Sequence, residues 1–147
     1  MGLVYRSPTD HDWELLWRIN SAGLGKVVRE EFNVSARQHR DFFDEHFRLS
    51  QNLQIIVVEG EDAGYLAHER RDDHIYVSGL VLLPPFQRRG IGTKIMRSIT
   101  NEASASGSDV RLQVLKSNPA RWFYEKLGFI VETETEHHYQ MVKHCRN

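Results

Sequence analysis

The chain has 147 residues and a formal net charge of −1 at pH 7, with 27% charged and 40% hydrophobic residues. This length predicts a single domain over residues 1–147 with a core of its own. The balanced charge argues against nucleic acid or a membrane surface as the main partner, and the longest apolar runs are far shorter than the roughly 20 residues that a membrane span needs.

Cysteine usage and the first residues predict a cytoplasmic location. The opening Met1-Gly2-Leu3-Val4 has neither a basic nor an apolar signal region. Cys145 is the single cysteine, so no internal disulfide can form, and its tail position offers no positioned base for a nucleophile. His137 and His138 are adjacent, and neighbouring strand residues point to opposite faces, so we expect no metal site there even with His144 and Cys145 nearby.

The first third of the chain predicts a strand and two helices. Leu3 to Arg6 is the expected strand, and Thr9 with Asp12 resembles an N-terminal capping box of a helix that ends near Gly23. A looser, glycine-containing stretch is expected from residue 23 to residue 33.

Ser35 and Gln38 predict the cap of a second helix. One face of this helix is aromatic, and core packing is its ordinary explanation, with a ligand pocket as the alternative. The aromatic face consists of Phe42, Phe43, His46 and Phe47.

The rest of the chain alternates strands and helices. This order, β-α-α-β-β-β-α-β-α-β-β, predicts an α/β (α+β) fold with a mixed sheet of about seven strands and four helices on both faces. The further strands are expected at residues 53–58, 63–70, 75–83, 109–115, 129–135 and 138–143, with a helix from Gly92, a loop at 104–108 and a short helix after residue 118.

The most informative stretch runs from His74 to Gly107. A buried strand ends at two prolines, and a basic glycine loop, FQRRGIG, leads directly into a helix with an apolar face at Ile91, Ile95 and Ile99. The first turn of such a helix directs free N–H groups and the positive end of its dipole toward the loop. The sequence therefore predicts an anion site, to which Arg88 and Arg89 add charge.

Two nucleotide-binding motifs are excluded for this loop. A Rossmann loop requires G-x-G-x-x-G, but Ile95 stands where the third glycine should be. A P-loop requires G-x-x-x-x-G-K-[ST], which neither this loop nor the stretch from Gly23 to Val27 supplies. An ordinary strand-to-helix turn with solvent-facing arginines remains the alternative.

A second informative stretch is KSNPARWFYEKLGF, from Lys116 to Phe129. Asn118 is suited to cap a short helix, Pro119 to occupy its first position, and Gly128 to end it in the left-handed conformation. Tyr124 falls on the face of this helix that points back toward the sheet.

The Q-R-R-G-I-G loop at 87–92, combined with Asn118-Pro119-Ala120 and Tyr124 to Phe129, closely resembles the GNAT superfamily of acetyl-CoA-dependent N-acetyltransferases. The resemblance implies acetyl-CoA as co-substrate, with its pyrophosphate on the loop amides and its pantetheine along the central strand like an added strand. The cofactor-binding residues implied are Leu80, Val81, Leu82, Leu83, Gln87, Arg88, Arg89, Gly90, Ile91, Gly92, Thr93 and Asn118. A pure capping role is the alternative for Asn118.

In this chemistry an amine attacks the thioester, an oxyanion forms and a CoA thiolate leaves. The resemblance implies Tyr124 as the general acid for that thiolate, with a core tyrosine as the alternative. The backbone N–H near Leu82 is the expected oxyanion donor.

The general base is less defined, because Tyr76 and Ser78 occupy the part of the central strand where many relatives carry a glutamate or histidine. His74, Glu30 and Glu31 are the candidates, and a water relay is an alternative to all three.

The acceptor is expected to be a primary amine of a small molecule or peptide. The resemblance implies that residues 23–49 form one wall of its site, and we expect Phe32, Phe43, Tyr76 and Ser78 to contact it. A homodimer is expected only by analogy. A non-catalytic acyl-CoA-binding or sensing module, or a transferase of a larger acyl group, remains the alternative function.

Overall fold

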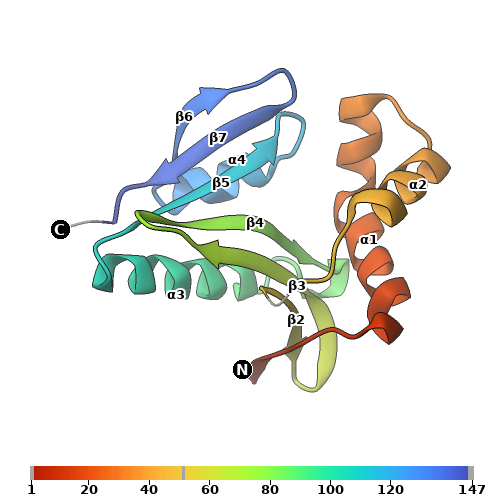
Figure 1. The fold of residues 1–147 in the computed structure, drawn as a ribbon, viewed down its shortest axis with the longest axis horizontal. Coiled ribbons are helices and arrows are strands. Elements are labelled where there is room, and N and C mark those ends of the chain that lie inside the picture. The colour runs from red at the N-terminus through yellow and green to blue at the C-terminus, as the bar shows by residue number, and fades with distance from the viewer. Residues whose placement is uncertain (1, 51, 146–147) are drawn as a thin grey trace. The chain divides into compact units, whose positions relative to one another are not determined.

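A computed structural model describes residues 2–50 and 52–145 of the chain. The elements follow the predicted order (Figure 1). The helices are α1 (Trp13–Phe32), α2 (Ala36–His46), α3 (Ile91–Ala105) and α4 (Ala120–Lys126). The strands are β1 (Leu3–Arg6), β2 (Leu53–Val58), β3 (Glu61–Arg70), β4 (His74–Leu82), β5 (Asp109–Leu115), β6 (Ile130–Glu134) and β7 (His138–Lys143).

The strands form a seven-stranded sheet in the order β1-β2-β3-β4-β5-β7-β6. The pairing of β4 with β5 is parallel, whereas β1–β2, β2–β3, β5–β7 and β6–β7 are antiparallel. The predicted α/β class with a mixed sheet is therefore confirmed. No helix in residues 2–50 and 52–145 is both long and apolar enough to cross a lipid bilayer.

The chain divides into two compact units, and β3 and β4 contribute residues to both. Unit 1 comprises residues 1–67 and 79–87, and unit 2 comprises residues 68–78 and 88–147.

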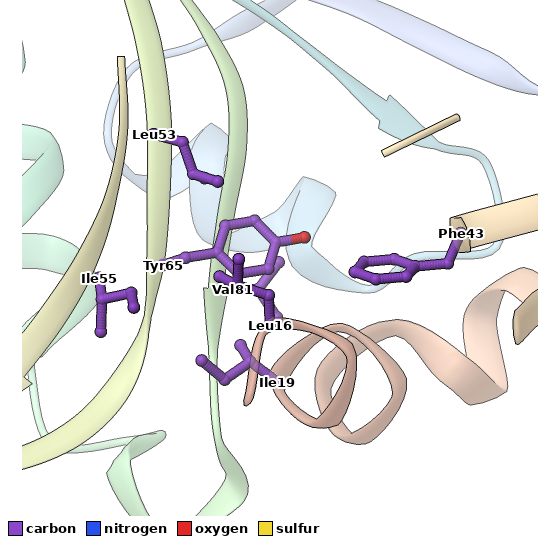
Figure 2. Packing of buried hydrophobic residues seen from close by; sticks show 7 residues of the cluster. All are labelled: Leu16, Ile19, Phe43, Leu53, Ile55, Tyr65 and Val81. Carbon is purple, nitrogen blue, oxygen red and sulfur yellow. The ribbon is translucent and has the colours of Figure 1, made fainter. Parts of the chain in front are cut away.

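Unit 1 is built around a hydrophobic cluster between α1, α2 and the strands β2, β3 and β4 (Figure 2). Its buried members are Leu16, Ile19, Phe43, Leu53, Ile55, Tyr65 and Val81. Figure 1 shows α1 and α2 side by side, and their aromatic rings meet where Trp13 lies 5.1 Å from Phe43, measured between ring centroids. Both capping boxes exist: Thr9 with Asp12 precedes α1, and Ser35 with Gln38 begins α2.

Unit 2 is organised around α3, which packs against β5. The predicted apolar face is buried, since Ile91, Ile95 and Ile99 are all less than one tenth exposed. The parallel register runs from His74 opposite Asp109 to Val77 opposite Leu112. Helix α3 continues to Ala105, two residues into the segment expected as a loop, and Ala103 near its end is fully buried on the same apolar face.

The expected loose stretch at 23–33 is wrong, because α1 continues without interruption to Phe32. Gly23 serves close packing. A Cβ atom there would lie 2.3 Å from Val81 Cγ1 and 3.3 Å from the carbonyl oxygen of Leu82. The helix backbone therefore lies directly on the end of β4, which is possible only without a side chain.

Two glycine substitutions in α1 test this packing. In a helix interior, glycine to alanine normally stabilises by about 0.5–1 kcal/mol. We expect Gly23→Ala instead to lower the free energy of unfolding of the protein by about 1–3 kcal/mol, because the new methyl group collides with Val81.

Gly25→Ala is the matched control, because its Cβ would meet the guanidinium group of Arg29, with Nη1 nearest at 2.8 Å, and the end of this flexible side chain can move away. We expect it to be neutral or stabilising in urea unfolding. Equal effects of the two substitutions would contradict the close approach of α1 to β4.

Candidate functional site

In unit 1 the end of β4 leads through a short 3-10 turn, Pro84–Phe86, into the glycine loop. The Nε2 amide of Gln87 donates to the carbonyl oxygen of Leu82 at 2.9 Å, and Phe86 is buried. Gln87, expected to contact the cofactor, therefore fastens the start of the loop to the end of the strand.

In unit 2 the loop turns sharply into α3. Arg88 and Gly90 have positive φ values of 61° and 79°, and the Lys94 N–H donates the first helical hydrogen bond to the Gly90 carbonyl at 3.0 Å. The amides of residues 91–93 consequently occupy the first turn, where a helix offers no internal acceptor. Together with the exposed side chains of Arg88 and Arg89, this geometry suits a bound anion.

Helix α4 packs against this first turn of α3. A Cβ atom on Gly92 would lie 3.3 Å from Phe123 Cζ, so the absence of a side chain lets the ring approach the α3 backbone. Gly92 therefore has a packing function besides exposing its amide.

Asn118 caps α4, as one of the two predicted roles requires. Its Oδ1 accepts the Ala120 N–H at 2.9 Å. This bond uses the oxygen of the amide and leaves the nitrogen as the group that could donate to a ligand.

Tyr124 lies almost wholly inside unit 2, with 8% of its surface exposed. Its ring meets Phe123 and Phe129 edge-on, with centroids 5.1 Å and 5.8 Å away. Burial raises the pKa of the Tyr124 phenol to about 12, so the hydroxyl remains protonated at neutral pH.

The base candidates occupy different parts of the chain. His74 begins β4 in unit 2, and its Nδ1 lies 2.6 Å from Asp73 Oδ1. Glu30 is exposed and Glu31 half-buried, both in the last turns of α1 in unit 1.

The expected acceptor contacts differ in exposure. Phe43 is only 3% exposed and packs in the unit 1 core, so its assignment to the acceptor site is corrected to a packing role. Phe32, at the end of α1, is 41% exposed. In unit 2, Ser78 is exposed, and Tyr76 is half-buried beneath the Arg71 guanidinium, 4.6 Å from the ring centroid.

A buried polar network in unit 1 escaped the sequence analysis. The Nε2 of His39 lies 2.9 Å from Asn20 Oδ1, and Asn20 Nδ2 donates to the Tyr65 hydroxyl at 2.9 Å. All three residues are at least nine-tenths buried. The available signal was a histidine one turn before Phe43 on the apolar face of α2.

No group of three or more His, Cys, Asp or Glu side chains in the described part of the chain is arranged to hold a metal ion.

Comparison with known proteins identifies the family. A model of the acetyltransferase (GNAT) domain matches residues 20–145, so the chain belongs to this family and the predicted resemblance is confirmed. N-alpha-acetyltransferase 50 of Danio rerio is 33% identical over 75 residues, which are 48% of this chain and 45% of that protein. The chain spans less than half the length of the first curated relatives it matches, 45% of this one and 13% of another.

Solved structures share the fold. The PaiA N-acetyltransferase from Thermoplasma acidophilum, in complex with coenzyme A, has a TM-score of 0.67 at 18% identity and covers 98% of this chain and 99% of its own. Arabidopsis thaliana Naa50, in complex with the bisubstrate analogue CoA-Ac-MVNAL, has a TM-score of 0.62 at 17% identity, covering 97% of this chain and 99% of its own.

Substitutions at Asn118 test its capping role. We expect Asn118→Ala to destabilise the protein by about 1 kcal/mol, because the Ala120 N–H loses its acceptor. Asn118→Asp keeps a capping oxygen and should retain wild-type stability in urea unfolding. Full stability of the alanine variant would show that the cap contributes nothing.

Proposed function

We propose that the protein is an N-acetyltransferase that moves the acetyl group of acetyl-CoA to a primary amine. The observation that carries the proposal is the turn from β4 into α3. It presents the first-turn amides of a helix beside Arg88 and Arg89 in a chain that belongs to the GNAT family. Coenzyme A is a pyrophosphate-containing guest for such an anion site, and PaiA with its bound coenzyme A supports the choice.

In this proposal the pyrophosphate accepts hydrogen bonds from the amides of residues 88–93. The pantetheine arm follows the backbone of Leu80 to Leu83. The pairing of β4 with β5 supports this path. It involves His74 to Val77 of β4 and does not include Leu80 to Leu83. Gln87 is fastened to the strand end in unit 1 through its bond to the Leu82 carbonyl.

The chemistry requires a neutral amine to attack the thioester carbon. A C–N bond forms, negative charge collects on the carbonyl oxygen, and the C–S bond then breaks as the amine loses a proton. The backbone N–H near Leu82 is our proposed donor to that oxygen. The departing sulfur leaves as a thiolate, whose conjugate thiol has an ordinary pKa of about 8.5.

Tyr124 is our proposed partner of the departing sulfur. With a pKa of about 12, its phenol is a weaker acid than the thiol, by roughly 3 pKa units. A complete proton transfer to the thiolate is therefore uphill. The hydroxyl stabilises the developing charge by donating a hydrogen bond, which becomes stronger as the C–S bond breaks.

A peptide amino terminus is the acceptor we favour over a small-molecule amine. The support comes from relatives, since N-alpha-acetyltransferase 50 carries the activity in its name and the Naa50 structure contains an analogue joining CoA to the peptide MVNAL. Residues 23–49, here called the acceptor segment, form one side of the acceptor site in this proposal, with the exposed Phe32 at the end of α1.

Turnover with acetyl-CoA and the peptide MVNAL tests the proposal, with released CoA thiol as the readout. The peptide with a blocked amino terminus and the amine spermidine are the comparison acceptors. Thiol release that requires a free peptide amine supports the proposed acceptor. Binding of acetyl-CoA without transfer to any amine would instead identify a binding module, and faster transfer from longer acyl-CoA thioesters would identify a different acyl donor.

Charge removal in the loop tests the phosphate site. We expect the double substitution Arg88→Ala and Arg89→Ala to raise the Kd of acetyl-CoA about tenfold or more, about 1.4 kcal/mol, and to weaken its salt dependence. Arg97→Ala is the matched control, because it removes an exposed charge from the same helix, α3, away from its N-terminal turn. Similar losses in both proteins would contradict a specific phosphate site.

Tyr124→Phe tests the hydroxyl while keeping the buried ring. We expect kcat to fall by about 10²-fold, as when one donor to a developing anion is removed, with the Kd of acetyl-CoA unchanged. Turnover at the wild-type rate would remove Tyr124 from the chemistry and leave it a core residue.

A further inference from the structure

The buried network of His39, Asn20 and Tyr65 joins three elements of unit 1. His39 belongs to α2, Asn20 to α1 and Tyr65 to β3. The Tyr65 ring also lies against the backbone of β4, because a Cβ atom on Gly79 would be 3.2 Å from Tyr65 Cε1. A chain of direct contacts therefore runs from the acceptor segment to the residue before Leu80.

Burial distinguishes this network from the other directional contacts between α2 and α1. The rings of Phe43 and Phe47 pack on Trp13 and on each other, and apolar packing tolerates a range of orientations. Arg40 pairs with Glu14 and Asp44 at the surface, where ion pairs contribute little. The indole N–H of Trp13 donates to Asp44 Oδ1 at 2.9 Å, also at the surface. The hydrogen bond from His39 is both buried and directional, so it specifies how α2 lies on α1.

The surroundings of the His39 ring favour its neutral form, although the Nε2–H bond to Asn20 could be made by either protonation state. Asn20 donates to Tyr65 through Nδ2, so its Oδ1 accepts from His39 Nε2–H. The other ring nitrogen, Nδ1, is buried and makes no hydrogen bond within the described residues, and the Trp17 ring lies edge-on at a centroid distance of 4.8 Å. Protonation would place an N–H donor and a positive charge at this unpartnered position.

The charged and titratable groups around His39 do not compensate such a charge. From α1, Arg29 adds a positive potential; from β3, Tyr65 remains neutral; and on α2 itself, Arg40 is already paired at the surface. Burial, and secondarily Arg29, lower the pKa of His39 below its ordinary 6.5.

We propose that His39 is a positioning residue for the acceptor site. In its neutral form it holds α2, through Asn20 and Tyr65, in the orientation that binds the acceptor amine, and its protonation releases that orientation. The inference rests on the proposed function, which assigns residues 23–49 to the acceptor site. It predicts weaker acceptor binding in acid with acetyl-CoA binding preserved.

His39→Gln and His46→Gln form a matched pair for the test. Glutamine at 39 keeps an amide N–H that can reach Asn20 and does not titrate. His46→Gln removes an exposed histidine from the same helix without touching the network. The KM for the MVNAL peptide, measured at pH 7.5 and pH 5.0, is the first readout. Protonation of the peptide amine affects all proteins equally, so comparison between them isolates His39.

We expect KM to rise on acidification at least threefold more in wild type and His46→Gln than in His39→Gln, with kcat changing alike in all three. Calorimetric Kd values for acetyl-CoA should respond equally to pH in all three. Identical pH responses of wild type and His39→Gln would overturn the proposal.

A second readout does not depend on turnover. Because the folded-state pKa of His39 is lowered, the unfolded chain binds its proton first, so folding stability is retained above about pH 6.5 and decreases as the pH falls below it. The decrease amounts to at most a tenfold change in the folding equilibrium constant per pH unit. Hydrogen-exchange protection of residues 36–46, corrected for intrinsic rates, should fall further in wild type and His46→Gln than in His39→Gln, because the contribution of His68, whose pKa burial also lowers, is common to all three.

The two readouts separate two kinds of failure. Absence of turnover with any acceptor would overturn the proposed function and the acceptor part of this inference, while acetyl-CoA calorimetry reports on the cofactor site alone. Equal protection of α2 in wild type and His39→Gln at both pH values would overturn the positioning role itself, whether or not the protein is active.

Discussion

The turn from β4 into α3 is the constraint on which the proposed chemistry depends. Two residues with positive φ, Arg88 and Gly90, redirect the chain within three positions, so that a helix begins immediately at Ile91. Free amides and a helix dipole attract phosphate without any acidic or basic group having to change its protonation state. The site is therefore built mainly from backbone, and its side chains add charge and hold the turn in place.

Glycines and aromatic residues then determine how closely other elements approach this part of the chain. In unit 2, the absence of a side chain at Gly92 allows the ring of Phe123 to pack on the first turn of α3, so that α4, which carries Tyr124 and follows Asn118, lies against this turn. In unit 1, the absence of a side chain at Gly23 allows α1 to pack on the end of β4, next to the hydrophobic cluster against which α2 packs. Close backbone approach leaves little freedom, which is what a reaction that depends on positioning requires.

Local patterns predicted much of this structure. The isoleucine repeat of α3, the Ser35 and Gln38 box and the Asn118 cap are short-range signals, and each lies where it was expected. The errors came from long-range packing. Gly23 was expected to end the helix, because its contact with Val81 cannot be read from the sequence. Phe43 was expected to contact the acceptor, because the core that buries it is formed by other parts of the chain. The hydrogen bond between His39 and Asn20 joins residues separated by 19 positions, and the bond between Asn20 and Tyr65 joins residues separated by 45 positions, so no local pattern could reveal the network.

Calorimetric titration of the purified protein shows whether the loop after β4 binds acetyl-CoA. Acetyl-CoA is the ligand, and ATP and NAD are the controls, because they carry phosphates without the pantetheine arm. We predict saturable binding of acetyl-CoA with one site per chain and much weaker binding of both controls. Equal binding of all three would mean that the loop is a general anion site, and no binding of acetyl-CoA would rule out the proposed acetyltransferase function.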